Sequence, residues 1–146
     1  ARAKAGKLRR IGTRPITVDV TFVDNAADAH LLAADKLAPG SAVAGKAYFL
    51  SDGEPVELWA FMNRVFALAG VPPVTKAVPA WRARLAARVA ERLYRWLPGE
   101  PPLTRFVVAQ LATSHWFDIS AARRDLGYEP RVTVEEGLKR LAETFQ

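Results

Sequence analysis

The sequence predicts a helix-rich α/β fold with few strands. Short runs rich in β-branched and aromatic residues alternate with longer segments in which apolar residues recur at helical spacing. Proline and glycine stand between these segments, where they end helices and permit turns. The chain has 146 residues and half of them are hydrophobic, which is enough for one globular portion with a real core.

Three segments are predicted to be strands. Residues 7–11 form a short candidate, and residues 16–23 (ITVDVTFV) are rich in the β-branched side chains that strands favour. Residues 46–51 (KAYFLS) form a nearly continuous apolar run. Such a run is typical of a strand that is buried on both faces of a parallel sheet.

Six segments are predicted to be helices because their apolar residues recur every three or four positions. The segments are residues 25–37, 55–69, 79–97, 104–111, 121–127 and 134–145. Side chains suited to helix N-termini precede or open several of them: Asp24 or Asn25, Pro55, Ser120, and Thr133 with Glu136 as a capping box.

Composition excludes several kinds of chemistry. The chain has no cysteine, so it can form neither a disulfide nor a thiolate zinc site, and a cytoplasmic location is expected. Its two histidines, His30 and His115, have no clustered carboxylates near them in sequence, so no metal site is expected. His30 is expected to pack or form a hydrogen bond beneath the sheet. His115 follows Thr113 and Ser114, but adjacent residues seldom aim at each other, so no nucleophile and base are assigned.

The net charge is +6 and the isoelectric point is about 10.1. Arginines and lysines cluster near the N-terminus and again in residues 82–95. A solvated surface is the favoured interpretation, and a polyanion site is the alternative. Nucleic acid is not expected as a partner, because aromatic residues do not interleave with the early cluster as a stacking platform requires.

Four passages, in order, carry a resemblance to a known family. They are VDVTFVDNAADAHLLA, GKAYFLSDGEPVELWAF, HWFDISAARRDLGYEP and TVEEGLKRLAETF. Together they resemble the C-terminal part of an extended short-chain dehydrogenase/reductase of the NAD-dependent epimerase/dehydratase superfamily. They are most similar to the 3β-hydroxysteroid dehydrogenase-like branch, which includes sterol dehydrogenases and 2-alkyl-3-oxoalkanoate reductases.

The resemblance implies that residues 1–146 are a single substrate-binding portion of an extended Rossmann-type enzyme. The family's Gly-rich turn and its catalytic Tyr-x-x-x-Lys are both absent from this sequence. The resemblance implies NAD or NADP as the cofactor of the full-length enzyme. Because both motifs are absent, this segment is expected to bind no cofactor and to supply no catalytic residue. The basic, alanine-rich start, ARAKAGKLRR, has no apolar core of a signal peptide, and it is read as the end of a helix with Gly6 as its C-cap.

The resemblance also bears on the substrate. Nucleotide-sugar enzymes of the superfamily carry, on the strand equivalent to residues 16–23, an arginine that clamps the diphosphate; Val18 stands at that position here. Arg14 is the alternative phosphate contact. An apolar hydroxy or keto substrate is expected, either sterol-like or a long-chain β-keto acid. The expected substrate-binding residues are Val18, Val20, Trp81, Leu85 and Trp96.

The helix that begins near Trp81 has three interpretations: a lid over an apolar pocket, a surface that meets a membrane or a partner, or plain core packing. Expected partners are the substrate, an N-terminal cofactor-binding half and a second copy of the chain, with a membrane surface as a further option. A homo-oligomer is expected because residues 46–50 would otherwise be an unpaired strand edge. The alternative function is a non-catalytic basic module that binds a lipid-like ligand, an anionic surface or nucleic acid.

Overall fold

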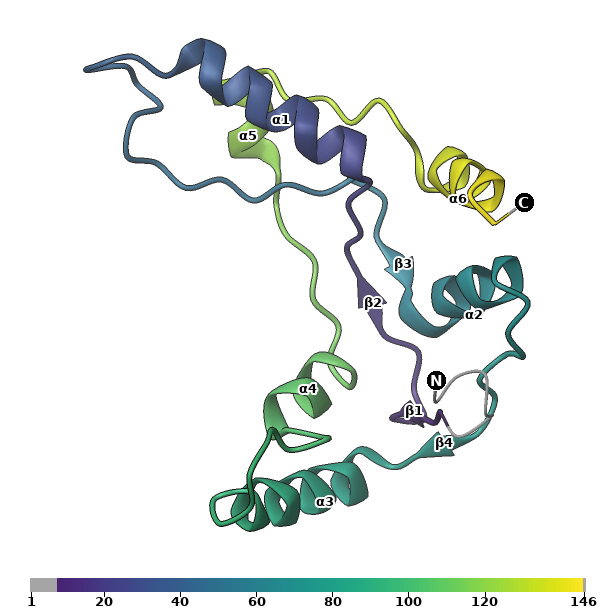
Figure 1. Cartoon of the computed structure of the whole chain (residues 1–146). Coiled ribbons are helices and arrows are strands. Elements are labelled where there is room, and N and C mark those ends of the chain that lie inside the picture. The colour runs from purple at the N-terminus through teal and green to yellow at the C-terminus, as the bar shows by residue number, and fades with distance from the viewer. Residues whose placement is uncertain (1–7, 146) are drawn as a thin grey trace. The chain divides into compact units, whose positions relative to one another are not determined.

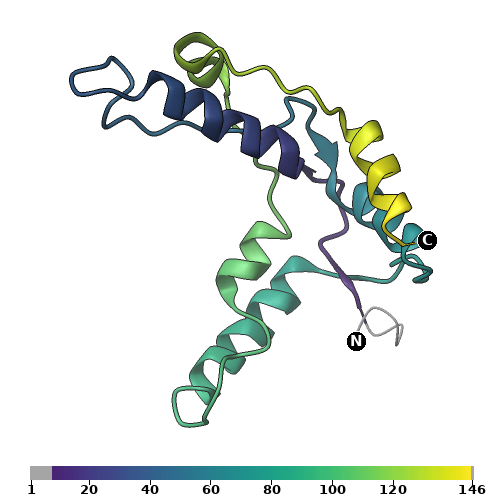
Figure 2. The same ribbon diagram turned by 45° about the horizontal axis from the view of Figure 1, so that its top comes forward.

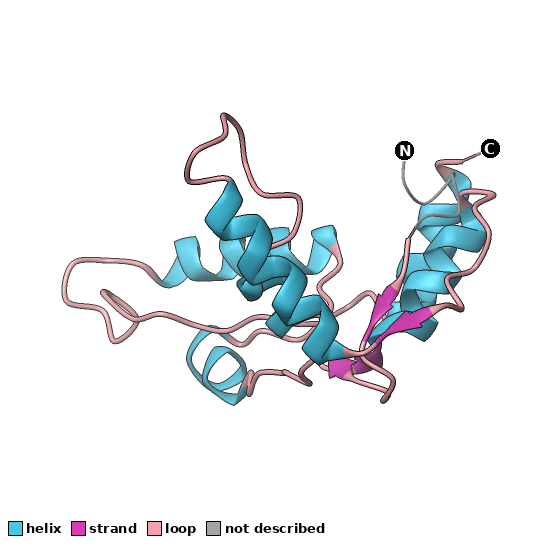
Figure 3. Cartoon of the chain, turned by 90° about the horizontal axis from the view of Figure 1, so that it is seen from below, coloured by secondary structure: helices cyan, strands magenta, loops and turns pink. Residues whose placement is uncertain are grey.

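A computed structural model describes residues 8–145 of the chain (Figure 1). Figure 3 shows that helices and loops dominate and that the strands are short. In chain order the elements are β1 (Arg10–Ile11), β2 (Thr17–Val18), α1 (Val23–Lys36), β3 (Val56–Glu57), α2 (Leu58–Leu68), β4 (Ala77–Val78), α3 (Ala80–Leu93), α4 (Arg105–Gln110), α5 (Ser120–Leu126) and α6 (Val134–Glu143).

These elements form two compact units. The described part of unit 1 comprises residues 8–17 and 57–115, and that of unit 2 comprises residues 18–56 and 116–145. The chain passes between the units within β2, within β3 and between His115 and Trp116. Strands β2 and β3 form one two-stranded sheet.

Unit 1 is organised around a short parallel pairing of β1 with β4, in which Arg10 aligns with Ala77 and Ile11 with Val78. Helices α3 and α4 run side by side in this unit (Figure 2). Their contact is made by small or β-branched side chains. The buried cluster consists of Ile11, Ala83, Ala87 and Val108.

Side chains cap the N-termini of two unit 1 helices, α2 and α4. Glu57 precedes α2 and its carboxylate accepts a hydrogen bond from the Ala60 N–H. Thr104 precedes α4 and accepts from the Val107 N–H at 3.2 Å, as the predicted short helix over residues 104–111 requires. After α2, the Asn63 amide oxygen accepts from the Val74 N–H at 2.8 Å and so fixes the extended, proline-containing segment that follows.

Unit 2 packs α1 against α5, with α6 as its third helix (Figure 1). Tyr128 is fully buried and its hydroxyl donates to the Ser51 carbonyl at 3.0 Å. The predicted capping position of α6 is correct, because Thr133 Oγ1 accepts from the Glu136 N–H at 3.2 Å. The buried cluster consists of Ala29, Ile119, Ala122, Leu126 and Tyr128.

The structure corrects two predicted helix starts. Asp24 and Asn25 do not cap α1; the N-cap is Phe22, which has no side-chain cap, and both polar residues lie in the first turn. Ser120 is likewise the first residue of α5 and not its cap. Asp118 accepts from the Ser120 N–H at 2.8 Å and thereby satisfies the free donor at that helix start.

The predicted third strand is wrong. Residues 46–51 are extended but pair with no strand among the described residues. Side chains hold this segment instead: the Tyr48 hydroxyl donates to Asp125 at 3.1 Å, and the Thr21 hydroxyl donates to the Leu50 carbonyl at 3.3 Å. The hydrophobic run alone does not make a strand, because a strand also needs a neighbour to accept its ladder of hydrogen bonds, and Phe49 of this run is exposed.

Two further predictions are corrected. The predicted helix over residues 79–97 is shorter, because α3 ends at Leu93, and residues 94–97 form turns and bends. His30 does not pack under a sheet; it is exposed on α1, and its Nδ1 lies 2.7 Å from the Ala26 carbonyl oxygen of the preceding turn. The predicted cap at Gly6 lies outside the described residues. Within residues 8–145, no helix is long and apolar enough to cross a bilayer.

Candidate functional site

The exposed side of α3 is the most distinctive surface of unit 1. Five residues line a groove of about 290 Å³ along its first half: Trp81, Arg84, Leu85, Arg88 and Arg105. Two of the predicted substrate-binding residues, Trp81 and Leu85, thus lie together. The Arg82 guanidinium lies 5.1 Å from the centre of the Trp81 ring, which is cation–π range.

Large apolar side chains of α3 point away from the core of unit 1. Trp81 is 61% exposed and Leu85 is 55% exposed, whereas Ala87 is fully buried. Trp96 is 88% exposed and lies after the last residue of α3, so it takes no part in the groove. Core packing of these bulky residues is therefore excluded within unit 1, which leaves the lid and the surface-contact interpretations.

Arg105 lines the groove in a fixed position because it is paired. Its backbone N–H and its Nε donate to the Glu91 carboxylate at 2.7 and 2.6 Å. The hydrogen bond from the Arg105 backbone N–H is the main reason that the pKa of Glu91 lies below its usual range. Arg84 and Arg88 have no carboxylate within ion-pair distance among residues 8–145, so their guanidinium groups are free to meet an anion.

The other two predicted substrate-binding residues belong to unit 2. Val18 is only 5% exposed and Val20 is half-buried. Val20 also takes part in backbone pairing, because its carbonyl accepts from the Asp52 N–H at 2.9 Å. Sequence reasoning missed an exposed aromatic pair in the same unit: Phe49 and Phe117 stack with ring centroids 4.3 Å apart.

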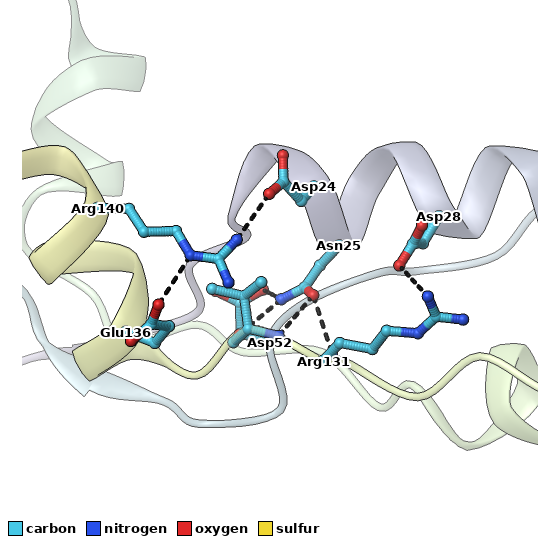
Figure 4. Close-up of polar contacts among 8 residues, drawn as sticks. Asp24, Asn25, Asp28, Asp52, Arg131, Glu136 and Arg140 are labelled. Atoms are coloured by element: carbon cyan, nitrogen blue, oxygen red, sulfur yellow. Dashed lines mark hydrogen bonds and ion pairs between the residues drawn. The ribbon is translucent and has the colours of Figure 1, made fainter. Parts of the chain in front are cut away.

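Asn25 is the polar centre of unit 2 (Figure 4). It is buried, and its amide nitrogen donates to Asp52 and to the Val132 carbonyl, both at 2.7 Å. Its amide oxygen accepts from the backbone N–H groups of Arg131 and Val132 at 2.9 and 3.0 Å. The Asn25 side chain thus joins α1 to two loops that are distant in sequence. We call Asn25 and Asp52 together the Asn25–Asp52 junction. Its role is structural.

Ion pairs surround this junction at the surface (Figure 4). Arg140 of α6 contacts Asp24 of α1 at 3.0 Å and Glu136 at 2.9 Å. Arg131 contacts Asp28 at 3.4 Å. Because these groups are largely exposed, each pair adds little stability alone, but together they orient α6 against the start of α1.

The strand-to-helix turn before α1 does not fit a dinucleotide. A pyrophosphate site at such a turn needs free backbone N–H groups and room for phosphate oxygens. Here the Phe22 N–H already donates to the Asp52 carboxylate at 2.9 Å, and the Asp24 carboxylate lies in the first turn of the helix. Two carboxylates would repel a pyrophosphate at this position, and the glycines of the sequence never follow the Gly-rich pattern.

The two polar residues before Trp116 have local structural roles. Ser114 Oγ accepts from the Thr17 N–H at 3.0 Å, and the His115 N–H donates to the Thr17 carbonyl at 2.9 Å. His115 Nδ1 lies 2.9 Å from the Thr113 carbonyl oxygen. These contacts fasten a loop to β2, and they do not align a nucleophile with a base. Within residues 8–145, no group of three or more potential ligands is arranged to hold a metal ion.

Known proteins similar to this chain include enzymes. The 2-alkyl-3-oxoalkanoate reductase of Stenotrophomonas maltophilia (strain K279a) is 50% identical over 142 residues, which cover 96% of this chain and 43% of that protein. The chain thus spans less than half the length of this curated relative. The same holds for the next two relatives that it matches.

Two solved structures share the fold. The crystal structure of gox2253 superposes with a TM-score of 0.61 at 26% identity, covering 99% of this chain and 41% of that one. The UDP-glucuronic acid 4-epimerase from Bacillus cereus, whose structure is a complex with NAD, gives a TM-score of 0.56 at 16% identity, covering 99% of this chain and 38% of that one. The second likeness shows the fold alone, which is that of an extended Rossmann-type short-chain dehydrogenase.

The family is shown by the sequence itself. The model described as the 3-beta hydroxysteroid dehydrogenase/isomerase family matches residues 1–78, which is more than half of the 146 residues. This match agrees with the four motifs that predict the same branch. The chain belongs to the 3-beta hydroxysteroid dehydrogenase/isomerase family.

Proposed function

We propose that this chain is the substrate-binding portion of an NAD(P)-dependent oxidoreductase that acts on an apolar hydroxy or keto compound. The family and the reductase activity named for a relative that is 50% identical support the reaction class. In the reduction direction, a hydride from the reduced nicotinamide joins the carbonyl carbon and a proton joins the oxygen, which converts the ketone to an alcohol.

The nature of the substrate rests chiefly on Val18. A diphosphate needs a guanidinium fork or a similar cation, and a buried valine offers only an apolar wall. The exposed apolar residues Trp81 and Leu85 suit the same kind of substrate. These residues support a sterol-like compound or a long-chain β-keto acid as the substrate in preference to a nucleotide sugar.

The cofactor is proposed to bind outside this chain. A pyrophosphate would need free N–H groups at the turn before α1, but the Phe22 N–H there donates to Asp52, and Asp24 lies in the first turn of the helix. The sequence also has no Tyr-x-x-x-Lys. The residues of this chain therefore bind and orient the substrate and exclude water from it. A cofactor-binding half supplies the proton-transfer groups as well as the NAD or NADP.

The test is substrate competition in the intact enzyme, followed by the rate of NADH or NADPH oxidation. A long-chain 2-alkyl-3-keto acid or a sterol should compete strongly for the site, and UDP-glucose should compete weakly. Replacing Trp81 with alanine should raise KM for the apolar substrate, whereas Leu31→Ala, an exposed leucine of α1, should leave KM unchanged. Competition by UDP-glucose as strong as that by the apolar compounds would refute the proposal.

A further inference from the structure

One face of α3 supplies four of the five residues that line the groove: Trp81, Arg84, Leu85 and Arg88. They stand at positions i, i+3, i+4 and i+7, a spacing that an amphipathic helix usually fills with apolar residues. Here arginine occupies two of the four positions. The alanines of another face, Ala83 and Ala87, pack in the core of unit 1. The groove is thus half apolar and half cationic, which suits a ligand of the same mixed character.

The two arginines of this face have no counter-ion in the described part of the chain. Glu91 is the only carboxylate of α3, and it stands three residues after Arg88, at a spacing that allows an ion pair. Its carboxylate instead accepts from the backbone N–H and the Nε of Arg105. Arg84 and Arg88 are exposed, with no carboxylate within ion-pair distance among residues 8–145. Because residues i and i+4 are neighbours on a helix, both guanidinium groups can reach one anion.

We propose that Arg84 and Arg88 bind the carboxylate of the substrate, which is then a long-chain keto or hydroxy acid. Trp81 and Leu85, on the same face, contact the first part of its alkyl chain. A guanidinium presents its donors in a planar fork that matches a carboxylate. This assignment rests on the proposed function, and within it the two arginines select an acid in preference to a neutral ketone or alcohol.

The composition of the groove distinguishes an acid from other ligands. A neutral ketone would use the apolar residues and leave both arginines without a partner. A phosphate of the cofactor would use the arginines and leave Trp81 and Leu85 exposed to water. A volume of about 290 Å³ lies at the small end of the range for ligand pockets, so it holds the carboxylate end of a long-chain acid and not a whole dinucleotide.

The experiment compares two substrates of the intact enzyme in the oxidation direction, with NAD⁺ or NADP⁺. One is a long-chain 2-alkyl-3-hydroxy acid and the other is its methyl ester, which keeps the alkyl chains and the reacting hydroxyl but has no charge. The KM of the wild type should be about tenfold lower for the acid, because hydrogen bonds between charged groups contribute that much or more. High salt should raise the KM for the acid and leave the KM for the ester unchanged.

Variants of the groove assign this preference to residues. Replacing Arg84 and Arg88 with glutamine should raise the KM for the acid about tenfold, to that of the ester, with kcat and the KM for the cofactor unchanged. Replacing both with lysine keeps the charge without the fork and should restore part of the preference. The matched control is Arg92→Gln with Arg95→Gln, which removes the same charge from exposed residues outside the groove and should change the KM for the acid by about twofold at most.

Circular dichroism verifies that each variant keeps its helices, as expected for exposed positions. Equal KM values for acid and ester in the wild type, or an equal loss in the glutamine variant and its control, would overturn the assignment and leave the proposed function intact. A raised KM for the cofactor but not for the acid would also overturn it, because the arginines would then contact a cofactor phosphate. Turnover of neither compound would contradict the proposed function itself, and the assignment with it.

Discussion

The two units keep their elements together by different means. In unit 2 a buried amide and a buried carboxylate, Asn25 and Asp52, join segments that are far apart in the chain. In unit 1 small apolar side chains hold the elements together, and the large side chains of α3 point outward. The difference indicates that buried polar groups specify the fold of unit 2. In unit 1 the large apolar side chains of α3 stay exposed and are available for binding.

The largest expected effect separates the two units directly. Asn25→Ala should lower the free energy of unfolding by about 3 kcal/mol or more, because it leaves Asp52 and the loop at Val132 with unpaired buried polar groups. The matched control in unit 1 is Asn63→Ala, which removes one bond from the Val74 N–H and should cost about 1 kcal/mol. Urea unfolding measures both, and equal losses would contradict the comparison.

Two substitutions on α3 test which of its faces stabilises unit 1. Ala87→Leu inserts a large side chain into a fully buried position and should destabilise the unit by about 1–3 kcal/mol. Leu85→Ala removes an exposed side chain and should change stability by about 0.5 kcal/mol or less. Thermal unfolding of the two variants compares them. A larger loss for Leu85→Ala would mean that the bulky face is packed after all.

The smallest effect concerns a surface cluster of unit 2 and depends on pH. The hydrogen bond from Arg124, assisted by Tyr48 and Lys46, lowers the pKa of Asp125 to about 2. Because the folded-state pKa lies below that of an unfolded aspartate, about 3.9, the contribution is present above pH 4 and is lost as pH falls toward 2. Wild type and Asp125→Asn should therefore differ in stability at neutral pH and converge near pH 2. A constant difference across this range would exclude the mechanism.

Much of the helical structure can be predicted from the sequence. Helical spacing locates α4 to within a few residues, and helical spacing with the capping residue Thr133 does the same for α6. These signals are local, since a cap involves side chain and backbone within one turn. Asn25 shows the limit of the same reasoning, because its position suggests a cap while its actual partners are about 27 and 107 residues away in the chain.

Strand pairing and binding sites depend on contacts between residues that are far apart in the sequence. Residues 46–51 have the composition of a buried strand, but no strand lies beside them among the described residues. The amphipathic pattern of α3 predicts that one face is buried, and the bulky face would be the natural choice. The structure buries the alanines instead, because small side chains allow α3 to approach α4 and β1 closely. The family motifs, by contrast, identify the fold without any of these contacts.

We propose that this chain supplies the substrate side of an oxidoreductase and that another portion binds the cofactor. Calorimetric titration of the 146-residue chain with NADH and with NADPH tests this claim most directly. Asp52 already accepts the Phe22 N–H at the turn before α1, and Asp24 adds a second carboxylate in the first turn of the helix. We therefore predict no binding beyond weak, nonspecific association. Micromolar affinity for either dinucleotide would contradict the account.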